Sequence, residues 1–323
     1  MPIEELARRR VMRSAAVFPG QGSQYPGMGR RLYAGSAAVR QFFDTAADVL
    51  GWDLWDLCAG GAEGDLNETS RSQPAIYTLS YAVFRLLLDH GWQPDIVAGH
   101  SLGEFSAAAA AGVFTFQDGL RTVAERGRLM AQAAQRKPGT MLALLGVRED
   151  ELREALAELG NSGVIAPANY NCPGQVVIAL ERKLLDHAKT RLGSIAKKVV
   201  ELPVSGGFHS SLMEEAQIAF SKFLAEIPVE RPCIPLLLSV TLAASSDPME
   251  IRKALTEQMT SPVRWQEAVE HMISREVTTF VEVGPKDVLT GLIRRIARDH
   301  RVVVTDGREP QEIVSELGRA NGV

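Results

Sequence analysis

Residues 95–104 have the residue types and spacing of a serine nucleophile. Four residues of strand character, Asp95–Ala98, lead directly into Gly99-His100-Ser101-Leu102-Gly103, and an alanine-rich helical stretch follows from Phe105 to Gly112. A strand, a sharp turn and a helix in this order are typical of a nucleophile elbow, which exposes the serine hydroxyl at the tip of a strained turn. Glycine at 99 and 103 removes side chains that would collide with neighbouring backbone. The first N–H groups of the helix would stabilise an oxyanion at Ser101.

The same five-residue pattern also occurs by chance in chains of this length, so it needs a partner. A serine nucleophile at neutral pH needs a base, and histidine is the usual one. His100 would point away from the tip of the turn, and we interpret it as a packing or hydrogen-bonding residue. The six histidines are His90, His100, His187, His209, His271 and His300.

His209 is the candidate base among these six. Four of the others lie in or at the end of charged helical stretches, where a solvated histidine is the ordinary case. His209 instead follows a Gly206-Gly207 loop after a predicted strand and precedes a helix. Loops at strand ends are where α/β sheets place their chemistry.

Length and composition are those of an ordinary globular protein. The chain has 323 residues, 46% hydrophobic and 23% charged, which is enough for one large domain or two modest ones. The 35 basic and 39 acidic residues give a formal charge of −4, which provides no bulk attraction to nucleic acid or to an anionic membrane. We therefore expect neither of these as a partner.

The chain shows no sign of export or of metal binding. Its apolar runs are shorter than the roughly 18 residues of a spanning helix, and residues 1–13 are charged, unlike a secretory signal. The widely spaced Cys58, Cys172 and Cys233 form neither a metal pattern nor a disulfide framework. These features predict a cytoplasmic protein.

Strands and helices alternate along most of the chain. We expect strands over 15–18, 95–99, 236–240, 278–284 and 302–304, and helices over 30–50, 73–90, 116–135, 210–227, 249–259, 262–274 and 287–297. Residues 51–72 are turn-rich, and Pro74 is expected near the start of its helix, where proline is tolerated best. This alternation predicts a largely parallel sheet covered on both faces.

The periodicity changes beyond Pro138. A strand, a helix, two strands, a helix and a strand are expected over 141–147, 149–159, 164–169, 175–180, 182–192 and 198–204, which is the element order of a ferredoxin-like unit. We therefore predict an α/β fold in which an α/β-hydrolase-like large subdomain, residues 14–137 and 205–307, contains an inserted ferredoxin-like small subdomain, residues 138–204. Residues 1–13 and 308–323 would be terminal extensions.

Eight motifs in order resemble those of one family. They are Phe18-Pro-Gly-Gln21-Gly-Ser-Gln, Gln73-Pro-Ala, Gly99-His-Ser-Leu-Gly-Glu104, Glu125-Arg126-Gly127, Asn169-x-Asn171-x-Pro-Gly-Gln175, Phe208-His209-Ser, Ser261-Pro-Val and Glu282-Val-Gly-Pro285. From about residue 14 to 307 the chain resembles the malonyl-CoA:acyl carrier protein transacylases, a family that includes the acyltransferase domains of fatty acid and polyketide synthases. One departure is Leu180, where the family often has glycine.

The resemblance implies roles for five residues. Ser101 would take a malonyl group from coenzyme A as an ester, and His209 would act as general base and then general acid. The main-chain carbonyl of Gln258 would orient that histidine, so changes to the Gln258 side chain are expected to matter little. Backbone N–H groups of Gln21 and Leu102 would form the oxyanion hole.

The resemblance also implies how the acyl group is selected. Arg126 would bind the free carboxylate of malonate with two parallel hydrogen bonds; the residues alone do not distinguish it from Arg128, and either could be a solvated helix residue. The bulky Phe208 would leave no room for an α-methyl branch, although simple packing also accounts for it. Asn169 and Asn171 would line the site.

The partners implied are malonyl-CoA, as a substrate, and acyl carrier protein, with no cofactor and no metal, and we expect a monomer. An acidic carrier protein would need a basic patch, for which Arg294-Arg295 near Lys286 and Arg298, or Lys197-Lys198, are candidates.

Three alternatives remain at this point. A serine thioesterase or other acyl hydrolase acting on acyl carrier protein would share the elbow, but its histidine lies near the C-terminus after an acidic residue. A non-catalytic partner could bind the carrier protein without acyl transfer. An acyltransferase could instead belong to, or act in trans on, a polyketide synthase.

Overall fold

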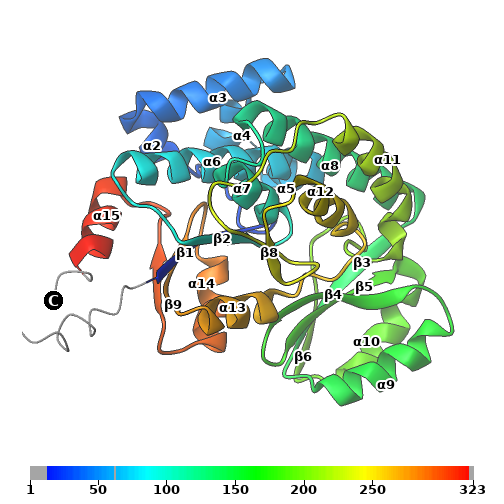
Figure 1. The fold of residues 1–323 in the computed structure, drawn as a ribbon. Helices are drawn as coiled ribbons and strands as arrows, with labels where there is room; N and C mark the ends of the chain where they lie inside the picture. The colour runs from blue at the N-terminus through cyan, green and yellow to red at the C-terminus, as the bar shows by residue number, and fades with distance from the viewer. Residues whose placement is uncertain (1–12, 62, 320–323) are drawn as a thin grey trace, which may run out of the picture.

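The computed structural model describes residues 13–61 and 63–319, and it contains two sheets (Figure 1). The larger sheet has six strands in the order β10-β9-β1-β2-β7-β8. Five of them run parallel, and β8 pairs antiparallel with β7 at one edge. The strands are β1 (Arg13–Phe18), β2 (Ile96–Gly99), β7 (Leu236–Leu238), β8 (Ala243–Ser245), β9 (Val277–Glu282) and β10 (Arg301–Val304). The predicted parallel sheet is confirmed, and β8 is an addition that the sequence did not indicate.

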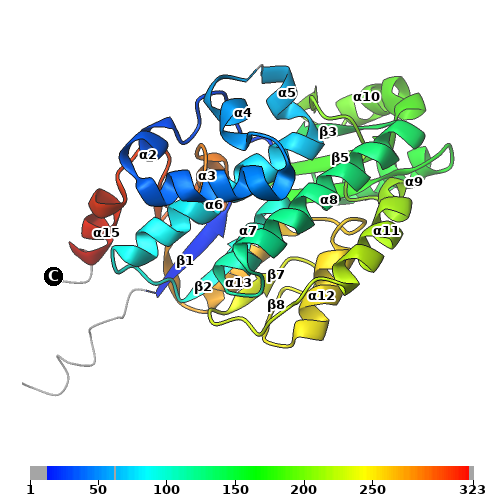
Figure 2. The same cartoon turned by 90° about the horizontal axis from the view of Figure 1, so that it is seen from above.

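Both faces of the large sheet are covered by helices. In β1, Ala16 and Phe18 belong to one buried cluster, and Ala15 and Val17 belong to another on the opposite face, as the two-residue repeat of a strand requires. Helices α6 (Thr69–Asp89), α7 (Leu102–Ala110) and α8 (Phe116–Arg136) cover the first face (Figure 2). Helices α13 (Trp265–Ser274) and α14 (Val288–Ile296) cover the second (Figure 1).

The N-terminal helices differ from the sequence prediction. Helix α6 begins at Thr69, so Pro74 lies inside it and not at its start. The segment around Pro74 is almost entirely buried, and this packing offsets the cost of the missing backbone donor. Ser36 is extended and divides the expected helix over 30–50 into α2 (Arg30–Gly35) and α3 (Ala37–Leu50). The stretch expected to be turn-rich contains α4 (Leu54–Gly60) and α5 (Glu63–Asn67).

The smaller sheet is antiparallel, with the order β4-β5-β3-β6. Its strands are β3 (Gly139–Leu145), β4 (Ile165–Cys172), β5 (Gln175–Glu181) and β6 (Lys198–Glu201), and α9 (Glu149–Gly160) and α10 (Leu185–Gly193) pack on it around a separate core (Figure 1). This is the predicted ferredoxin-like unit. Leu180 is fully buried in that core, so the departure from glycine fills space in the small unit.

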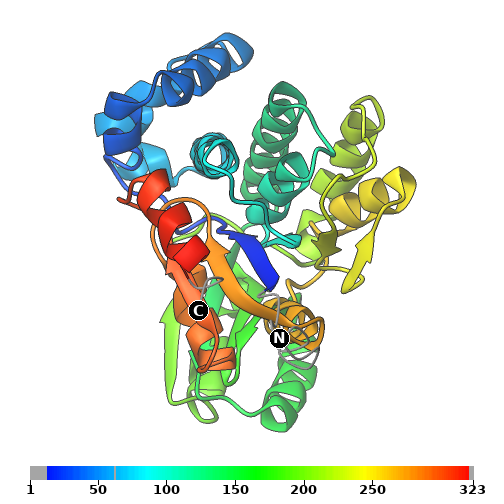
Figure 3. The same cartoon turned by 60° about the vertical axis from the view of Figure 1, so that its left-hand side comes forward.

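The C-terminal part adds three helices, α11 (Glu214–Ala225), α12 (Pro248–Glu257) and α15 (Pro310–Arg319). Helix α15 lies beside α6 and buries Ile313 and Leu317 (Figure 3). Residues 1–12 and 320–323 of the expected extensions lie outside the described residues. Over residues 13–61 and 63–319, no helix is both long and apolar enough to cross a membrane.

Candidate active site

Ser101 lies at a strained turn between β2 and α7. Its φ of 53° and ψ of −110° are unusual for a residue with a side chain. A Cβ atom at Gly99 would lie 2.0 Å from the Gly103 carbonyl carbon, and one at Gly103 would lie 1.9 Å from the Phe18 carbonyl oxygen. The two glycines therefore let the turn press against β1, which is the geometry predicted for a nucleophile elbow.

His209 is in hydrogen-bond contact with Ser101. The Ser101 Oγ atom lies 2.7 Å from His209 Nε2, and His209 Nδ1 lies 2.9 Å from the Gln258 carbonyl oxygen and 3.1 Å from that of Ser261. Carbonyl oxygens only accept hydrogen bonds, so the proton resides on Nδ1 and Nε2 is left to accept the serine proton. His209 also has a positive φ of 58°, so both members of the pair are held in sparsely populated backbone conformations.

Burial keeps His209 neutral. The side chain is enclosed, and desolvation together with the nearby charge of Arg126 lowers its pKa to about 3. Among the described residues, His209 has no carboxylate partner to raise that pKa. At neutral pH the imidazole is therefore in the form that can accept a proton.

Arg126 is the second charged feature of the site, and it is 1% exposed. Its Nη1 donates to Gln73 Oε1 at 2.9 Å, and its Nη2 donates to Gln258 Oε1 at 2.9 Å and to Ser101 Oγ at 3.3 Å. The Nε atom has no partner among the described residues, and none of their carboxylates forms an ion pair with this guanidinium. Burial lowers the Arg126 pKa to about 10, so the group stays charged.

The structure distinguishes Arg126 from Arg128, which the sequence alone did not. Arg128 is on the surface and pairs with Glu125 through bonds of 2.6 and 2.7 Å. Of the two, Arg126 is the one that points at Ser101. A buried guanidinium without a carboxylate partner next to a nucleophile is suited to bind the carboxylate of a substrate.

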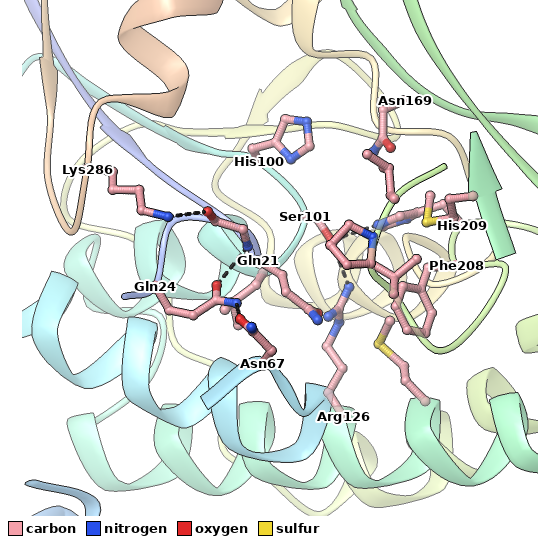
Figure 4. Close-up of a pocket in the computed structure, with 17 residues that line it drawn as sticks. Gln21, Gln24, Asn67, His100, Ser101, Arg126, Asn169, Phe208, His209 and Lys286 are labelled. Atoms are coloured by element: carbon pink, nitrogen blue, oxygen red, sulfur yellow. Dashed lines mark hydrogen bonds between the residues drawn. The ribbon is translucent and has the colours of Figure 1, made fainter. Parts of the chain in front are cut away.

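Two backbone donors belong to residues that line the same cavity as Ser101. The N–H groups of Gln21 and Leu102 donate to none of the described residues, and both residues line the cavity beside Ser101. The loop that carries Gln21 is fixed by Gln24 Oε1, which accepts from the Gly22 N–H at 2.7 Å, and by Lys286 Nζ, which donates to the Gly22 carbonyl at 3.1 Å (Figure 4).

These groups surround a cavity of about 380 Å³ (Figure 4). Phe208 and Asn169 line it, as the sequence predicted, together with the apolar Met130 and Met141. Asn171 does not line it. Its Oδ1 instead lies 2.9 Å from His100 Nε2, so the expectation that Asn171 faces the site was wrong, and His100 is the hydrogen-bonding residue that was predicted.

The side chain of Gln258 has contacts that the sequence did not indicate. It is 1% exposed, its Oε1 accepts from Arg126, and its Nε2 donates to the Ser101 carbonyl at 3.0 Å and to Glu104 Oε2 at 2.6 Å. These contacts speak against the expectation that changes to this side chain matter little, which stays untested. Glu104 stood in the elbow motif without an assigned role, and only its burial in the fold reveals its contact with Gln258.

The small sheet contacts the segment after Gln258 beside the histidine. The Val263 N–H donates to the Ala168 carbonyl at 2.8 Å, and the Tyr170 N–H donates to the Val263 carbonyl at 2.9 Å, so β4 is joined to the segment after Gln258. That segment also carries the Ser261 carbonyl bonded to His209. The small unit therefore braces the backbone that orients the base.

Metal chemistry has no obvious ligand set in the part of the chain that the structure describes. No group of three or more histidine, cysteine, aspartate or glutamate residues is arranged there to hold an ion. The three cysteines are free, with Cys58 and Cys172 buried and Cys233 exposed.

Comparison with known proteins places this geometry in a family. Residues 16–321 match the acyl transferase domain family. A malonyl CoA-acyl carrier protein transacylase of Escherichia coli O157:H7 is 39% identical over 284 residues, which is 87% of this chain and 92% of that protein. The chain belongs to the acyl transferase family.

Solved structures agree over nearly the whole chain. An acyl carrier protein S-malonyltransferase from Vibrio cholerae is 40% identical with a TM-score of 0.90, covering 94% of this chain and 99% of that one. A malonyl-transacylase solved in complex with the acyl carrier protein of a type II polyketide synthase is 36% identical with a TM-score of 0.91 and the same coverage. The predicted fold class and acyltransferase activity are confirmed.

Proposed function

We propose that this enzyme moves a malonyl group from coenzyme A to the phosphopantetheine thiol of an acyl carrier protein through an ester on Ser101. The observation that carries the proposal is Arg126, a buried cation without a carboxylate partner among the described residues, whose Nη2 lies 3.3 Å from Ser101 Oγ. That distance suits a short acyl group with a free carboxylate at its far end. The names of the relatives support the same acyl donor and acceptor.

In the first half-reaction His209 Nε2 takes the proton of Ser101 Oγ as this oxygen attacks the thioester carbonyl. The N–H groups of Gln21 and Leu102 donate to the oxyanion that develops, and one such donor contributes about 2.7–4 kcal/mol in comparable acyl transfers. As the intermediate collapses, the carbon–sulfur bond breaks and His209 returns the proton to the departing coenzyme A sulfur.

The second half-reaction reverses these steps with another thiol. His209 accepts the proton of the carrier's thiol, the sulfur attacks the ester carbonyl, and Ser101 leaves with the proton from His209. The Gln258 carbonyl keeps the imidazole in one tautomer throughout, because it accepts from Nδ1 at 2.9 Å. No step needs a redox or metal group, so absence of a cofactor stays our prediction.

Selection of the acyl group rests on Arg126 and the cavity wall. A neutral acetyl group would leave the guanidinium buried without a charged partner, which is costly. Phe208 and Asn169 close the cavity around the acyl chain, and we propose that the phenyl ring disfavours a branch at the α-carbon.

We also propose that the chain divides as the sequence suggested. Residues 14–137 and 205–307 would form the catalytic subdomain, residues 138–204 the small subdomain, and residues 1–13 and 308–323 the extensions, of which the C-terminal one packs on the catalytic subdomain through Ile313 and Leu317. A monomer, a cytoplasmic location and docking of the carrier protein near the exposed Arg294 and Arg295 of α14 stay predictions.

Hydrolysis is the competing reaction. A thioesterase of the α/β-hydrolase type would orient its histidine with a carboxylate, whereas the described partners of His209 Nδ1 are two main-chain carbonyls. The type II polyketide synthase relative in complex with its carrier protein supports transfer, and it keeps polyketide synthesis beside fatty acid synthesis as the pathway served.

The test supplies the enzyme with malonyl-CoA and a phosphopantetheinylated acyl carrier protein and follows the carrier by mass spectrometry. We expect malonyl-carrier to form much faster than free malonate, and parallel double-reciprocal plots because the acyl-enzyme forms before the carrier binds. Free malonate released continuously, with the carrier unmodified, would instead indicate a hydrolase. Carriers from fatty acid and polyketide synthesis, compared side by side, assign the pathway.

A further inference from the structure

A buried carboxylate that the mechanism does not use lies behind the site. Glu104 is fully buried on the first turn of α7. Its Oε1 accepts from the Ser239 N–H at 3.2 Å, and its Oε2 accepts from Ser239 Oγ at 2.5 Å and from Gln258 Nε2 at 2.6 Å. Burying a carboxylate costs folding free energy, which hydrogen bonds and a nearby positive charge only partly offset. Such a residue is therefore a candidate for a role in the site.

Gln258 connects this carboxylate to Arg126, to His209 and to the backbone of Ser101. Its side chain contacts Arg126 and the Ser101 carbonyl, and its own carbonyl accepts from His209. The orientation of this single amide therefore determines whether Arg126 meets an acceptor and whether the Ser101 carbonyl meets a donor.

The order of donors and acceptors permits one orientation of that amide. The Ser239 N–H at one end and the Arg126 guanidinium at the other can only donate. Between them, Glu104 accepts on both sides, and Gln258 donates towards Glu104 and accepts from Arg126. A carboxamide at position 104 would present an N–H group to one of its two neighbours. Because both ends of this series of hydrogen bonds are fixed donors, two donors would then face each other at one of its contacts.

We propose that Glu104 is a positioning residue for malonyl recognition, because its carboxylate fixes the Gln258 amide with its oxygen towards Arg126. This rests on the proposed function. The carboxylate also balances the charge of Arg126 without contacting it. A direct ion pair would occupy the guanidinium that the substrate carboxylate needs, whereas one intervening amide leaves it free.

The ionisation of Glu104 depends on the same contacts. Burial raises the pKa of Glu104 above its ordinary value, and its hydrogen bonds from Ser239 and Gln258 and the charge of Arg126 offset only part of that rise. The contacts that hold the amide are thus the same ones that favour the ionised carboxylate.

The test is Glu104→Gln, measured with two acylating reagents. Malonyl-CoA requires the Arg126 site, whereas a neutral fluorophosphonate that labels Ser101 requires only the nucleophile, the base and the oxyanion donors. We expect malonylation of Ser101 to slow by about tenfold or more while fluorophosphonate labelling changes by less than about twofold, since one buried hydrogen bond is mispaired. Glu125→Gln, an equivalent change beside Arg126 on the surface, should alter neither rate.

Equal slowing of both reagents would mean that Glu104 acts only on general stability, and unchanged malonylation would remove its role altogether; either result overturns the proposal. If the wild-type enzyme forms no malonyl adduct but labels with the fluorophosphonate, the proposed function fails instead. The donor order is then judged by the melting temperature of Glu104→Gln relative to the wild type alone.

A double variant covers the case in which Glu104→Gln folds poorly. Glu104→Gln with Gln258→Glu restores a permitted order between Ser239 and Arg126, because the new amide accepts from Ser239 and donates to the new carboxylate. The Ser101 carbonyl then loses the Gln258 Nε2 donor and faces an acceptor, keeping only the backbone N–H of residue 104 at 3.1 Å. We expect the ratio of malonylation to fluorophosphonate labelling in the double variant to stay about tenfold or more below the wild-type ratio, since the carboxylate introduced at position 258 would pair directly with Arg126. A double variant with the wild-type ratio would contradict the proposal that an intervening amide keeps Arg126 free for the substrate.

Discussion

At the scale of single residues, the site depends on charges and dipoles held away from water. Ser101 and His209 are both placed by unusual backbone angles, and Arg126 is held charged in a buried position. Each of these choices costs folding free energy. The cost is consistent with a site in which the reacting groups are fixed before the substrate arrives.

Removal of the guanidinium should affect malonyl transfer selectively. We expect Arg126→Ala to lower kcat/KM for malonyl-CoA by about a hundredfold, because charge-assisted hydrogen bonds contribute about 1.5–3 kcal/mol. Arg126→Lys should restore little, since an ammonium cannot form two parallel bonds. Steady-state kinetics with malonyl-CoA and acetyl-CoA measure this, with Arg128→Ala as the matched surface control. An equal loss for both acyl groups would contradict carboxylate recognition.

The pH dependence follows from the neutral imidazole. Because the pKa of His209 is lowered to about 3, the base form persists as the pH falls, and the acylation rate should stay nearly constant from about pH 8 to about pH 5. Stopped-flow acylation with malonyl-CoA measures it. A rate that is half-maximal near pH 6.5, the ordinary value for histidine, would show that His209 is not desolvated in this way.

The same shift has a consequence for stability. In the unfolded chain the histidine binds a proton near pH 6.5, but in the folded protein it does so only near pH 3. Protons therefore favour the unfolded state between these values, and the free energy of unfolding should decrease as the pH falls from about 6.5 towards 3. Denaturant titrations of wild type and His209→Asn should differ in this slope, and equal slopes would contradict the buried neutral state.

Residue types explain which parts of the site could be predicted. Ser101 and His209 stand next to glycines at strand ends, a local signal that is visible in one sequence. Glu104, Lys286 and the Gln258 side chain carry no such signal, because their roles arise from contacts between segments far apart in the chain. The resemblance supplied Arg126, and the structure supplied the reason for it.

At the scale of elements, the elbow forms because β1, β2 and α7 approach one another more closely than a side chain at position 99 or 103 would permit. Local patterns predicted these elements, yet the same reasoning misplaced the start of α6, since burial outweighed the preference of Pro74 for a helix start. It also missed β8, a three-residue edge strand. Short and fully packed elements depend on their neighbours, which a local pattern does not describe.

The close approach at the elbow predicts that alanine substitution of two glycines has very different effects on stability. Gly103→Ala would place a Cβ atom 1.9 Å from the Phe18 carbonyl oxygen, and we expect it to cost more than about 3 kcal/mol of unfolding free energy and most of the activity. Gly160→Ala, at the end of α9 with no atom nearby, should be neutral or slightly stabilising. Thermal unfolding compares the two, and a Gly103→Ala protein as stable as wild type would contradict the packing described.

At the scale of the whole molecule, residues from the small sheet, from the turn after β2 and from α8 line the cavity beside Ser101. The parallel sheet supplies the nucleophile, the segment joined to β4 supplies the carbonyls that hold the base, and α8 supplies Arg126. The ferredoxin-like unit was predicted from element order alone. Its contact with the segment at Val263 could not be predicted in this way, because that contact joins residues almost one hundred positions apart.

The C-terminal helix packs on the core of the larger unit. Ile313 and Leu317 of α15 are buried against the core beside α6. Replacing both with alanine should cost about 3–6 kcal/mol, because each buried aliphatic side chain contributes about 1.5–3 kcal/mol. The exposed Glu312→Ala is the control. Denaturant unfolding gives the comparison, and a double variant as stable as the control would mean that α15 contributes no packing.

The central claim is a malonyl ester on Ser101, and intact-protein mass spectrometry with malonyl-CoA and no carrier protein tests it most directly. The wild-type protein should gain the mass of one malonyl group, and Ser101→Ala should gain none. The adduct should disappear when phosphopantetheinylated carrier protein is added. A wild-type protein that gains no mass, or a malonyl adduct that persists in Ser101→Ala, would contradict the account.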